Sequence, residues 1–208
     1  MTTSLQQLIK YAGIGSRETP TATLEVMEAI ARALGSRGAT LRSGAAAGAD
    51  TAFERGAVAS GGPMEIYLPW SGFQGRKAGG PFMDTGMDPR ALEMVMSGPM
   101  AHPAPGRLNP KAKKFMTRNF HQLLGKNLDD PVDLVTAWTE GGKFHPSKYR
   151  GEYKGTGTAQ NIRAAKHLGI PVLNLGSPRS DLLKTLKPEK MDEKTFEKMI
   201  DYLLENLY

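Results

Sequence analysis

Three short turns rich in glycine and hydroxyl side chains each follow a predicted β-strand, and their composition is typical of phosphate binding. They span residues 13–17 (GIGSR), 43–50 (SGAAAGAD) and 155–161 (GTGTAQN). Glycine lets the backbone approach an anion without a Cβ in the way, and the unpaired N–H groups that open the next helix point at it. The candidate phosphate-binding residues of these turns are Gly13, Gly15, Ser16, Arg17, Ser43, Gly44, Gly48, Gly155, Thr156, Gly157 and Thr158.

Three acidic residues are candidates for catalysis. Asp50 and Glu54 are four residues apart at the start of a predicted helix, so they share one helix face at the ligand end. That position suits a contact to a ribose hydroxyl, a water-mediated Mg²⁺ or a general base; alternatively, Asp50 caps its helix and Glu54 pairs with a surface cation. Glu140 follows the fourth predicted strand and is either a catalytic acid or an exposed loop residue. The four histidines have no metal-ligand spacing, and no protein metal site is predicted from them.

A basic stretch between residues 102 and 126 contains no aspartate or glutamate. It is predicted either to attract an anion, a nucleotide phosphate or a nucleic-acid backbone, or to form an ordinary solvated helix face. Arg118 and Asn119 lie in the middle of this stretch and are candidate ligand contacts. Trp138 and Tyr67, near predicted strand ends, either stack on a base or belong to the core. The cations of the stretch are Arg107, Lys111, Lys113, Lys114, Arg118 and Lys126.

Short apolar runs alternate with helical periodicity along the chain. Predicted strands cover residues 10–14, 39–42, 64–68, 132–137 and 171–175. Helices are predicted to start at three N-caps that each precede a proline, namely Thr19, Asp88 and Asn109, and one of these helices should end at Gly125. Residues 70–86 and 139–155 are predicted to be long loops.

This alternation predicts a single α/β domain over residues 1–208. The expected fold is Rossmann-like and doubly wound, with a mainly parallel five-stranded sheet flanked by helices. A C-terminal amphipathic helix over residues 192–207 is expected to dock on the domain through Phe196, Met199, Ile200, Leu203 and Leu204. In such a sheet the three glycine-rich turns meet at one edge, where ligands bind.

Composition excludes several classes of protein. The 208 residues contain no cysteine, so disulfides, thiolate metal sites and cysteine catalysis are excluded. No apolar run is long enough to cross a membrane and the N-terminus has no secretory pattern, so a cytoplasmic protein is expected. The net charge of +6 favours an anionic partner. Neither a Walker A motif nor a complete G-x-G-x-x-G with a ribose-binding acid is present, which disfavours an NTPase or a standard NAD dehydrogenase.

Several motifs occur in the order found in a known superfamily. They are residues 11–17 (YAGIGSR), 41–44 (LRSG), 48–50 (GAD) with Phe53 and Glu54, residues 117–119 (TRN) with Gln122 and Gly125, and residues 155–158 (GTGT). Over roughly residues 10–175 the chain resembles the SLOG superfamily, which includes the DprA (Smf) and LOG proteins. It looks most like the stand-alone DprA-like members, often encoded by phages or plasmids.

The resemblance implies a Rossmann-like fold that binds a nucleotide or nucleotide-derived ligand, single-stranded DNA in some branches, and often a homodimer. LOG enzymes cleave the N-glycosidic bond of nucleoside 5′-monophosphates with a Pro-Gly-Gly-x-Gly-Thr-x-x-Glu motif. Here a long insertion separates Glu140-Gly141-Gly142 from Gly157-Thr158, and Asn161 occupies the position of the last acid.

Three hypotheses therefore remain open. The first is a nucleotide-binding protein, with hydrolysis of a nucleoside 5′-monophosphate at its N-glycosidic bond or its phosphate ester. The second is a DprA-like protein that binds single-stranded nucleic acid. The third is a non-catalytic sensor of a nucleotide signal.

Overall fold

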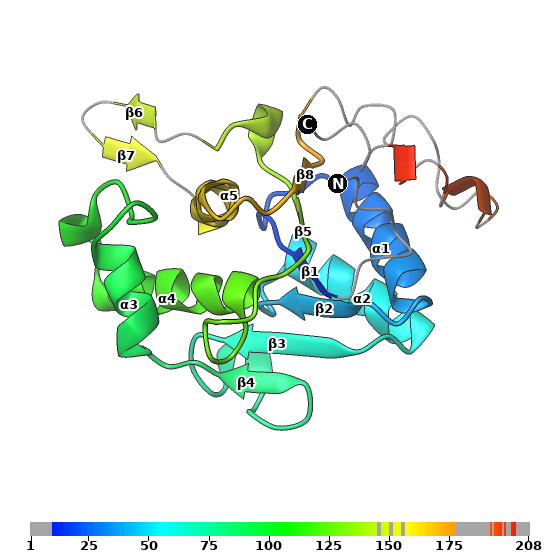
Figure 1. The fold of residues 1–208 in the computed structure, drawn as a ribbon, viewed down its shortest axis with the longest axis horizontal. Coiled ribbons are helices and arrows are strands. Elements are labelled where there is room, and N and C mark those ends of the chain that lie inside the picture. The colour runs from blue at the N-terminus through cyan, green and yellow to red at the C-terminus, as the bar shows by residue number, and fades with distance from the viewer. Residues whose placement is uncertain are drawn as a thin grey trace.

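A six-stranded parallel sheet forms the centre of the computed structural model, which describes residues 10–144, 147–149, 152–154, 157–177, 192, 194–196, 198 and 201–202. The strands of this sheet are β1 (Lys10–Gly13), β2 (Thr40–Ser43), β3 (Met64–Leu68), β4 (Phe82–Asp84), β5 (Leu134–Ala137) and β8 (Val172–Asn174). Their order across the sheet is β4-β3-β2-β1-β5-β8, from the bottom to the top of Figure 1. This architecture confirms the Rossmann-like α/β fold.

Helices cover both faces of the sheet. They are α1 (Thr21–Gly35), α2 (Ala49–Ser60), α3 (Pro89–Met96), α4 (Pro110–Leu124) and α5 (Gly157–His167). The first two pack against each other on one face, while α4 and α5 cover the other and α3 packs on α4 (Figure 1). Each face has its own buried apolar cluster, one with α1 and α2 and one with the remaining three helices. Burial on both faces explains why the central strand β5 is buried at all four positions and is mostly apolar.

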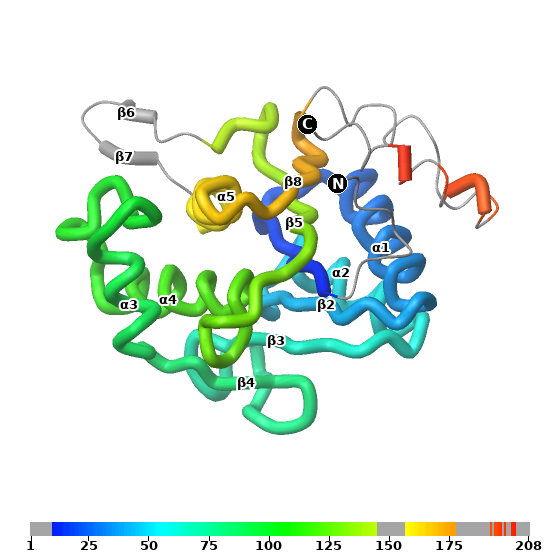
Figure 2. Tube along the Cα trace, viewed as in Figure 1, coloured from blue at the N-terminus to red at the C-terminus, as the bar shows by residue number. Residues whose placement is uncertain are grey.

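The strand order reverses at β1, which pairs with β2 on one side and with β5 on the other. Tyr11 of β1 stands beside Leu41 and Leu134 in the two ladders. The chain therefore winds outward from the middle of the sheet in both directions, as the tube in Figure 2 shows. The carboxyl ends of strands at such a reversal are where doubly wound folds bind their ligands.

Two predicted loops contain structure that the sequence did not predict. Residues 70–86 include the edge strand β4 and a 3₁₀ turn at Phe73–Gly75, so the main sheet has six strands rather than five. Residues 139–155 include another 3₁₀ turn and a separate antiparallel hairpin of β6 (Ser147–Tyr149) and β7 (Glu152–Lys154). Three-residue strands are too short to show a hydrophobic period, and backbone pairing alone defines them.

Two of the three predicted helix caps are confirmed. Asp88 accepts a hydrogen bond from the Arg90 amide, and Asn109 accepts one from the Ala112 amide. Gly125 ends α4 with a φ of 76°. The cap at Thr19 is wrong, because α1 begins one residue later with Pro20 at the N-cap, and the Thr19 hydroxyl donates to the Ser16 carbonyl instead.

The C-terminal part of the chain is described only at a few positions. Phe196 is buried in the cluster that includes α1 and α2. Met199, Ile200, Leu203 and Leu204 lie outside the described residues, so the docking of residues 192–207 as a helix stays a prediction. None of the described helices has the length and apolarity needed to cross a membrane.

Candidate functional site

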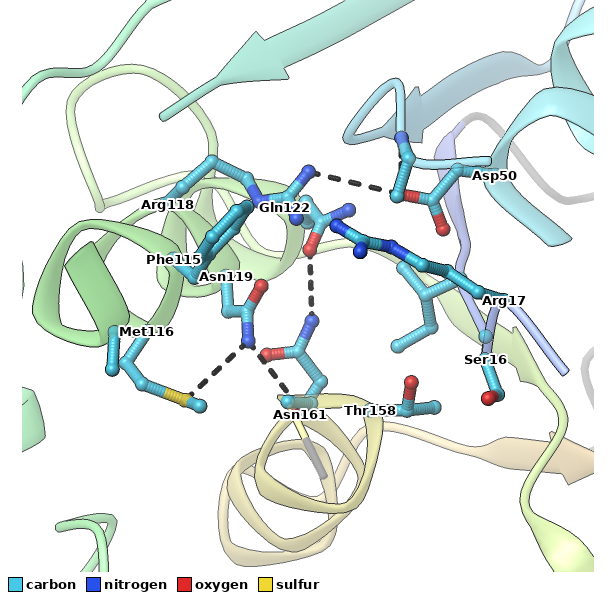
Figure 3. Close-up of a pocket in the computed structure, with 15 residues that line it drawn as sticks. Ser16, Arg17, Asp50, Phe115, Met116, Arg118, Asn119, Gln122, Thr158 and Asn161 are labelled. Carbon is cyan, nitrogen blue, oxygen red and sulfur yellow. Dashed lines mark hydrogen bonds and ion pairs between the residues drawn. The ribbon is translucent and has the colours of Figure 1, made fainter. Parts of the chain in front are cut away.

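A cavity of about 300 Å³ lies at the carboxyl edge of the sheet, where the strand order reverses (Figure 3). Four segments surround it: the turn after β1, the turn before α2 together with the start of that helix, one face of α4, and the start of α5. We call this cavity the switch-point pocket. Its lining residues are Ile14, Gly15, Ser16, Arg17, Ala46, Asp50, Ala112, Phe115, Met116, Arg118, Asn119, Gln122, Gly157, Thr158 and Asn161.

The first glycine-rich turn contributes directly to the pocket. Gly15, Ser16 and Arg17 line it, and in Figure 3 the Arg17 side chain extends into the space between the labelled residues. Hydrogen bonds within the chain fix the conformation of this turn, because the Ser16 carbonyl accepts from both the amide and the hydroxyl of Thr19. Gly13 does not line the pocket, and its missing Cβ leaves room for the ring of Phe53.

Both glycines of the second turn serve packing rather than the pocket surface. Gly48 has a φ of 86°, and a Cβ there would lie 2.8 Å from the Ser16 carbonyl oxygen. Ser43 is fully buried, and its hydroxyl donates to the Gly13 carbonyl at 2.7 Å. Neither residue lines the pocket, and Gly44 lies beneath the side chain of Arg118. The first two turns therefore support each other, and the second contributes Ala46 and Asp50 to the pocket.

The third turn reaches the pocket at the start of α5. Gly157 and Thr158 line it, whereas Gly155 and Thr156 lie outside the described residues. The first N–H groups of an α-helix have no partner within the helix, and the helix dipole makes this end attractive to an anion. The start of α5 therefore suits a phosphate.

Arg118 and Asp50 form a buried ion pair in the wall of the pocket, with Nη1 and Oδ2 3.7 Å apart. The same nitrogen donates to the carbonyl oxygen of Gly44. Burial raises the pKa of the Asp50 carboxyl, and Arg118 and the Ala46 amide oppose this shift. Nε of Arg118 is buried and has no hydrogen-bond partner among the described residues. A buried N–H without a partner is costly.

The charges lining the pocket favour an anionic ligand. Among the described residues, the lining contains two guanidinium groups, Arg17 and Arg118, and one carboxylate, Asp50. Because the carboxylate is already engaged with Arg118, Arg17 supplies the uncompensated positive charge.

Three buried amides form the wall between α4 and α5. Asn119 donates to the Gly157 carbonyl at 3.2 Å, and Asn161 donates to the side-chain oxygen of Gln122 at 3.0 Å (Figure 3). The sequence predicted a ligand contact for Asn119 but not for the other two. The available signal was helical spacing, because residues 115, 118, 119 and 122 share one face of a helix.

The predicted catalytic acids do not meet in one place. Asp50 lines the pocket, but Glu54 does not, and it pairs with Arg76 instead. Burial raises the pKa of Glu54, although Arg76 lowers it. Glu140 is exposed in a 3₁₀ turn and does not line the pocket. Of the three predicted acids, Asp50 is therefore the one placed to touch a ligand in this pocket.

Phe115 is the aromatic residue that the structure brings to the pocket. Tyr67 is fully buried and stacks on His121, and Trp138 packs against the core. Phe115 lines the pocket and makes edge-on contacts with Trp70 and Phe73, with ring centroids 5.3 Å and 5.5 Å away. These contacts fix the orientation of its ring.

Residues able to hold a metal ion are dispersed. No group of three or more histidine, aspartate or glutamate side chains with metal-binding geometry occurs in the part of the chain that the structure describes. The expectation of Mg²⁺ held through water therefore has no cluster of protein ligands to support it there.

Comparison with known proteins finds similarity in the first third of the chain. Residues 2–69 match the family model of DNA recombination-mediator protein A. No curated protein and no solved structure matches the chain. The matched segment contains β1 to β3 with α1 and α2, and hence the first two turns, but not α4 or α5. This match supports the DprA-like part of the resemblance. The three buried amides of Asn119, Gln122 and Asn161 lie outside the matched residues.

Proposed function

We propose that the switch-point pocket binds one nucleotide through its phosphate. The observation that carries the proposal is the meeting of Arg17, the guanidinium of Arg118 and the start of α5 in the lining of one cavity. Arg17 contributes an exposed charge, Arg118 a buried guanidinium and α5 its helix dipole, and each of these favours an anion. The phosphate-binding roles of Gly15, Ser16, Gly157 and Thr158 belong to this proposal.

The size of the pocket limits the ligand. Its volume of about 300 Å³ is at the lower end of small-molecule sites, which range over roughly 300–1,000 Å³. A mononucleotide suits this space, and a dinucleotide cofactor would extend out of it. The apolar side chains of Ile14, Phe115 and Met116 in the lining suit the flat face of a base.

Isothermal titration calorimetry with ribose 5-phosphate and nucleoside monophosphates tests this proposal. We expect Arg17→Ala to weaken the binding of ribose 5-phosphate about tenfold to a hundredfold, because a charge-assisted hydrogen bond is lost. The matched control is Arg32→Ala, which removes an exposed guanidinium from the last turn of α1. Equal losses in both variants, or no binding of any phosphate ligand to the wild type, would contradict the proposal.

Whether the pocket also hydrolyses its ligand depends on the carboxyl groups that line it. Most glycoside hydrolases use two carboxyl groups that flank the scissile bond. Asp50 is the one carboxylate lining the pocket among the described residues, and it already pairs with Arg118. We therefore propose binding as the primary function. Asp50 is the group to substitute if chromatography of a nucleoside-monophosphate incubation reveals free base or nucleoside.

A second candidate function is the binding of single-stranded DNA. The match of residues 2–69 to a family of recombination mediators favours it, as does the row of lysines on α4 that leads to Phe115. Lys111 places its Nζ 5.9 Å from the centre of the Trp70 ring, and Lys113 and Lys114 follow it. Cations beside aromatic rings are typical of surfaces that hold single strands by backbone charge and base stacking.

The salt dependence of oligonucleotide binding tests this second candidate. We expect Lys111→Ala to reduce the slope of log K against log salt by about 0.7, the share of one phosphate contact on a single strand. The control is Lys126→Ala, an exposed lysine beyond the other end of α4. Binding that needs an oligonucleotide and ignores mononucleotides would favour this candidate over the first, and no binding at low salt would exclude it.

A further inference from the structure

The amides of Asn119, Gln122 and Asn161 are each at least nine-tenths buried and line the switch-point pocket together. They come from two helices that are far apart in the sequence, and hydrogen bonds join Asn119 to the Gly157 carbonyl and Asn161 to Gln122. A buried polar group needs a partner, since an unsatisfied amide end costs the full energy of its lost hydration. The ends of these amides that face the pocket therefore specify what a ligand has to offer.

Asn119 presents an acceptor. Its nitrogen donates to the carbonyl oxygen of Gly157 and lies 3.9 Å from the sulfur of Met116. Because a carbonyl oxygen can only accept, the NH₂ group must be on that side, and this fixes the orientation of the amide. Oδ1 of Asn119 is left for the pocket.

Gln122 and Asn161 together present one further free oxygen and one free NH₂ group. One amide oxygen and one NH₂ group are engaged in the bond between them, which leaves one oxygen and one NH₂ group. If the nitrogen and oxygen atoms were exchanged in both side chains, the hydrogen bond between them would run in the opposite direction. One oxygen and one NH₂ group would still be left free. The wall as a whole therefore offers two oxygens and one NH₂ group that are not engaged within it, and the engaged NH₂ group of the pair keeps its second N–H.

We infer that this wall reads the edge of a nucleobase that carries an exocyclic amino group. The inference rests on the proposed nucleotide-binding function and names the class of base. Cytosine and adenine bring two N–H bonds on the amino group and an adjacent ring nitrogen that accepts, and guanine brings N1–H, its amino group and O6. Each can satisfy all three amide ends.

Uracil and hypoxanthine do not match this wall. Each has one N–H on its pairing edge, so one buried amide oxygen keeps no partner when they bind. A site built around hydrogen bonds rejects a ligand that leaves one of its polar groups unpaired. The chemistry of the wall thus selects amino bases over their oxo counterparts.

Paired nucleotides that differ in one group test the inference by calorimetry. We expect CMP to bind at least about tenfold more tightly than UMP, and GMP at least about tenfold more tightly than IMP. Equal affinities within both pairs, or nucleotides no tighter than ribose 5-phosphate, would overturn the inference and leave phosphate binding intact. If neither ribose 5-phosphate nor any nucleotide bound, the proposed function itself would fail, and the inference with it.

A variant separates reading of the base from other causes of preference. Asn119→Ala removes one acceptor, after which cytosine and uracil can each satisfy the remaining pair. We expect the ratio of CMP to UMP affinity to fall to within about threefold of unity, and Asn127→Ala, on an exposed loop, to keep the wild-type ratio. An unchanged ratio in a folded Asn119→Ala protein, checked by circular dichroism, would contradict the assignment. The wild-type comparison decides the inference even if this variant fails to fold.

Discussion

Arg118 extends from α4 across the turn that follows β2, and its guanidinium occupies the space where a side chain at residue 44 would lie. The hydrogen bond to the Gly44 carbonyl and the ion pair with Asp50 hold it there. The glycine that the sequence suggested for phosphate contact therefore has a packing role as well. Three features of the chain, a glycine, an acid and an arginine, depend on one another at this point.

We expect Gly44→Ala to lower the free energy of unfolding by about 1–3 kcal/mol, the usual cost of overpacking. The added Cβ would overlap Nη1 of Arg118, which would have to leave Asp50. Chemical denaturation measures this change. Gly106→Ala is the control, because a Cβ at Gly106 meets nothing within 4 Å and no positive φ is needed there. Equal midpoints for the two variants would refute the packing role.

Among the elements, α4 connects the most parts of the site. One face supplies Arg118 and Gln122 to the pocket, while His121 turns toward β3 and the start of α3. The His121 ring stacks on Tyr67 with centroids 5.7 Å apart, and its Nδ1 lies 3.1 Å from the Gly125 carbonyl. Nε2 lies 3.8 Å from Asp88, the N-cap of α3. The position of α4 therefore depends on a buried histidine.

The pKa of His121 provides a test of this arrangement. Burial lowers it below the ordinary value of 6.5, against the opposing effects of Gly125 and Asp88. The unfolded chain then takes up its proton first, so the contribution of His121 to stability is complete above pH 6.5 and declines as the pH falls below it. We expect the free energy of unfolding of the wild type to drop more steeply between pH 7 and 5 than that of His121→Gln, by at most about 1.4 kcal/mol per pH unit.

His102, whose pKa burial lowers, and the buried acids Asp50 and Glu54, whose pKa burial raises, are present in both proteins. The difference between wild type and variant therefore isolates His121. The control is His167→Gln, the same exchange at the exposed last residue of α5. Parallel curves for wild type and His121→Gln would show that residue 121 does not titrate differently in the folded protein.

At the scale of the whole molecule, the strand order brings distant turns together. Residues 13–17, 43–50 and the start of α5 meet at one edge because β1, β2 and β5 are adjacent and parallel. Alternating strands and helices with glycine-rich turns were sufficient to predict this edge. The prediction from sequence missed β4, because three residues are too few to show a hydrophobic period. Only the pairing with β3 identifies these residues as a strand.

The amino-acid sequence by itself determined the fold class, two helix caps and the location of the glycine-rich turns. These depend on local chemistry: apolar periodicity, the φ freedom of glycine and side chains that satisfy their own backbone. Only the tertiary structure decided which of the marked residues share a pocket. The tertiary structure brought Asp50, Arg118 and Asn161 together and left Glu54 and Glu140 outside the pocket. These residues meet because α4 and α5 pack over the edge of the sheet. That packing joins residues as far apart in the sequence as Asp50 and Asn161, and no local pattern encodes such contacts.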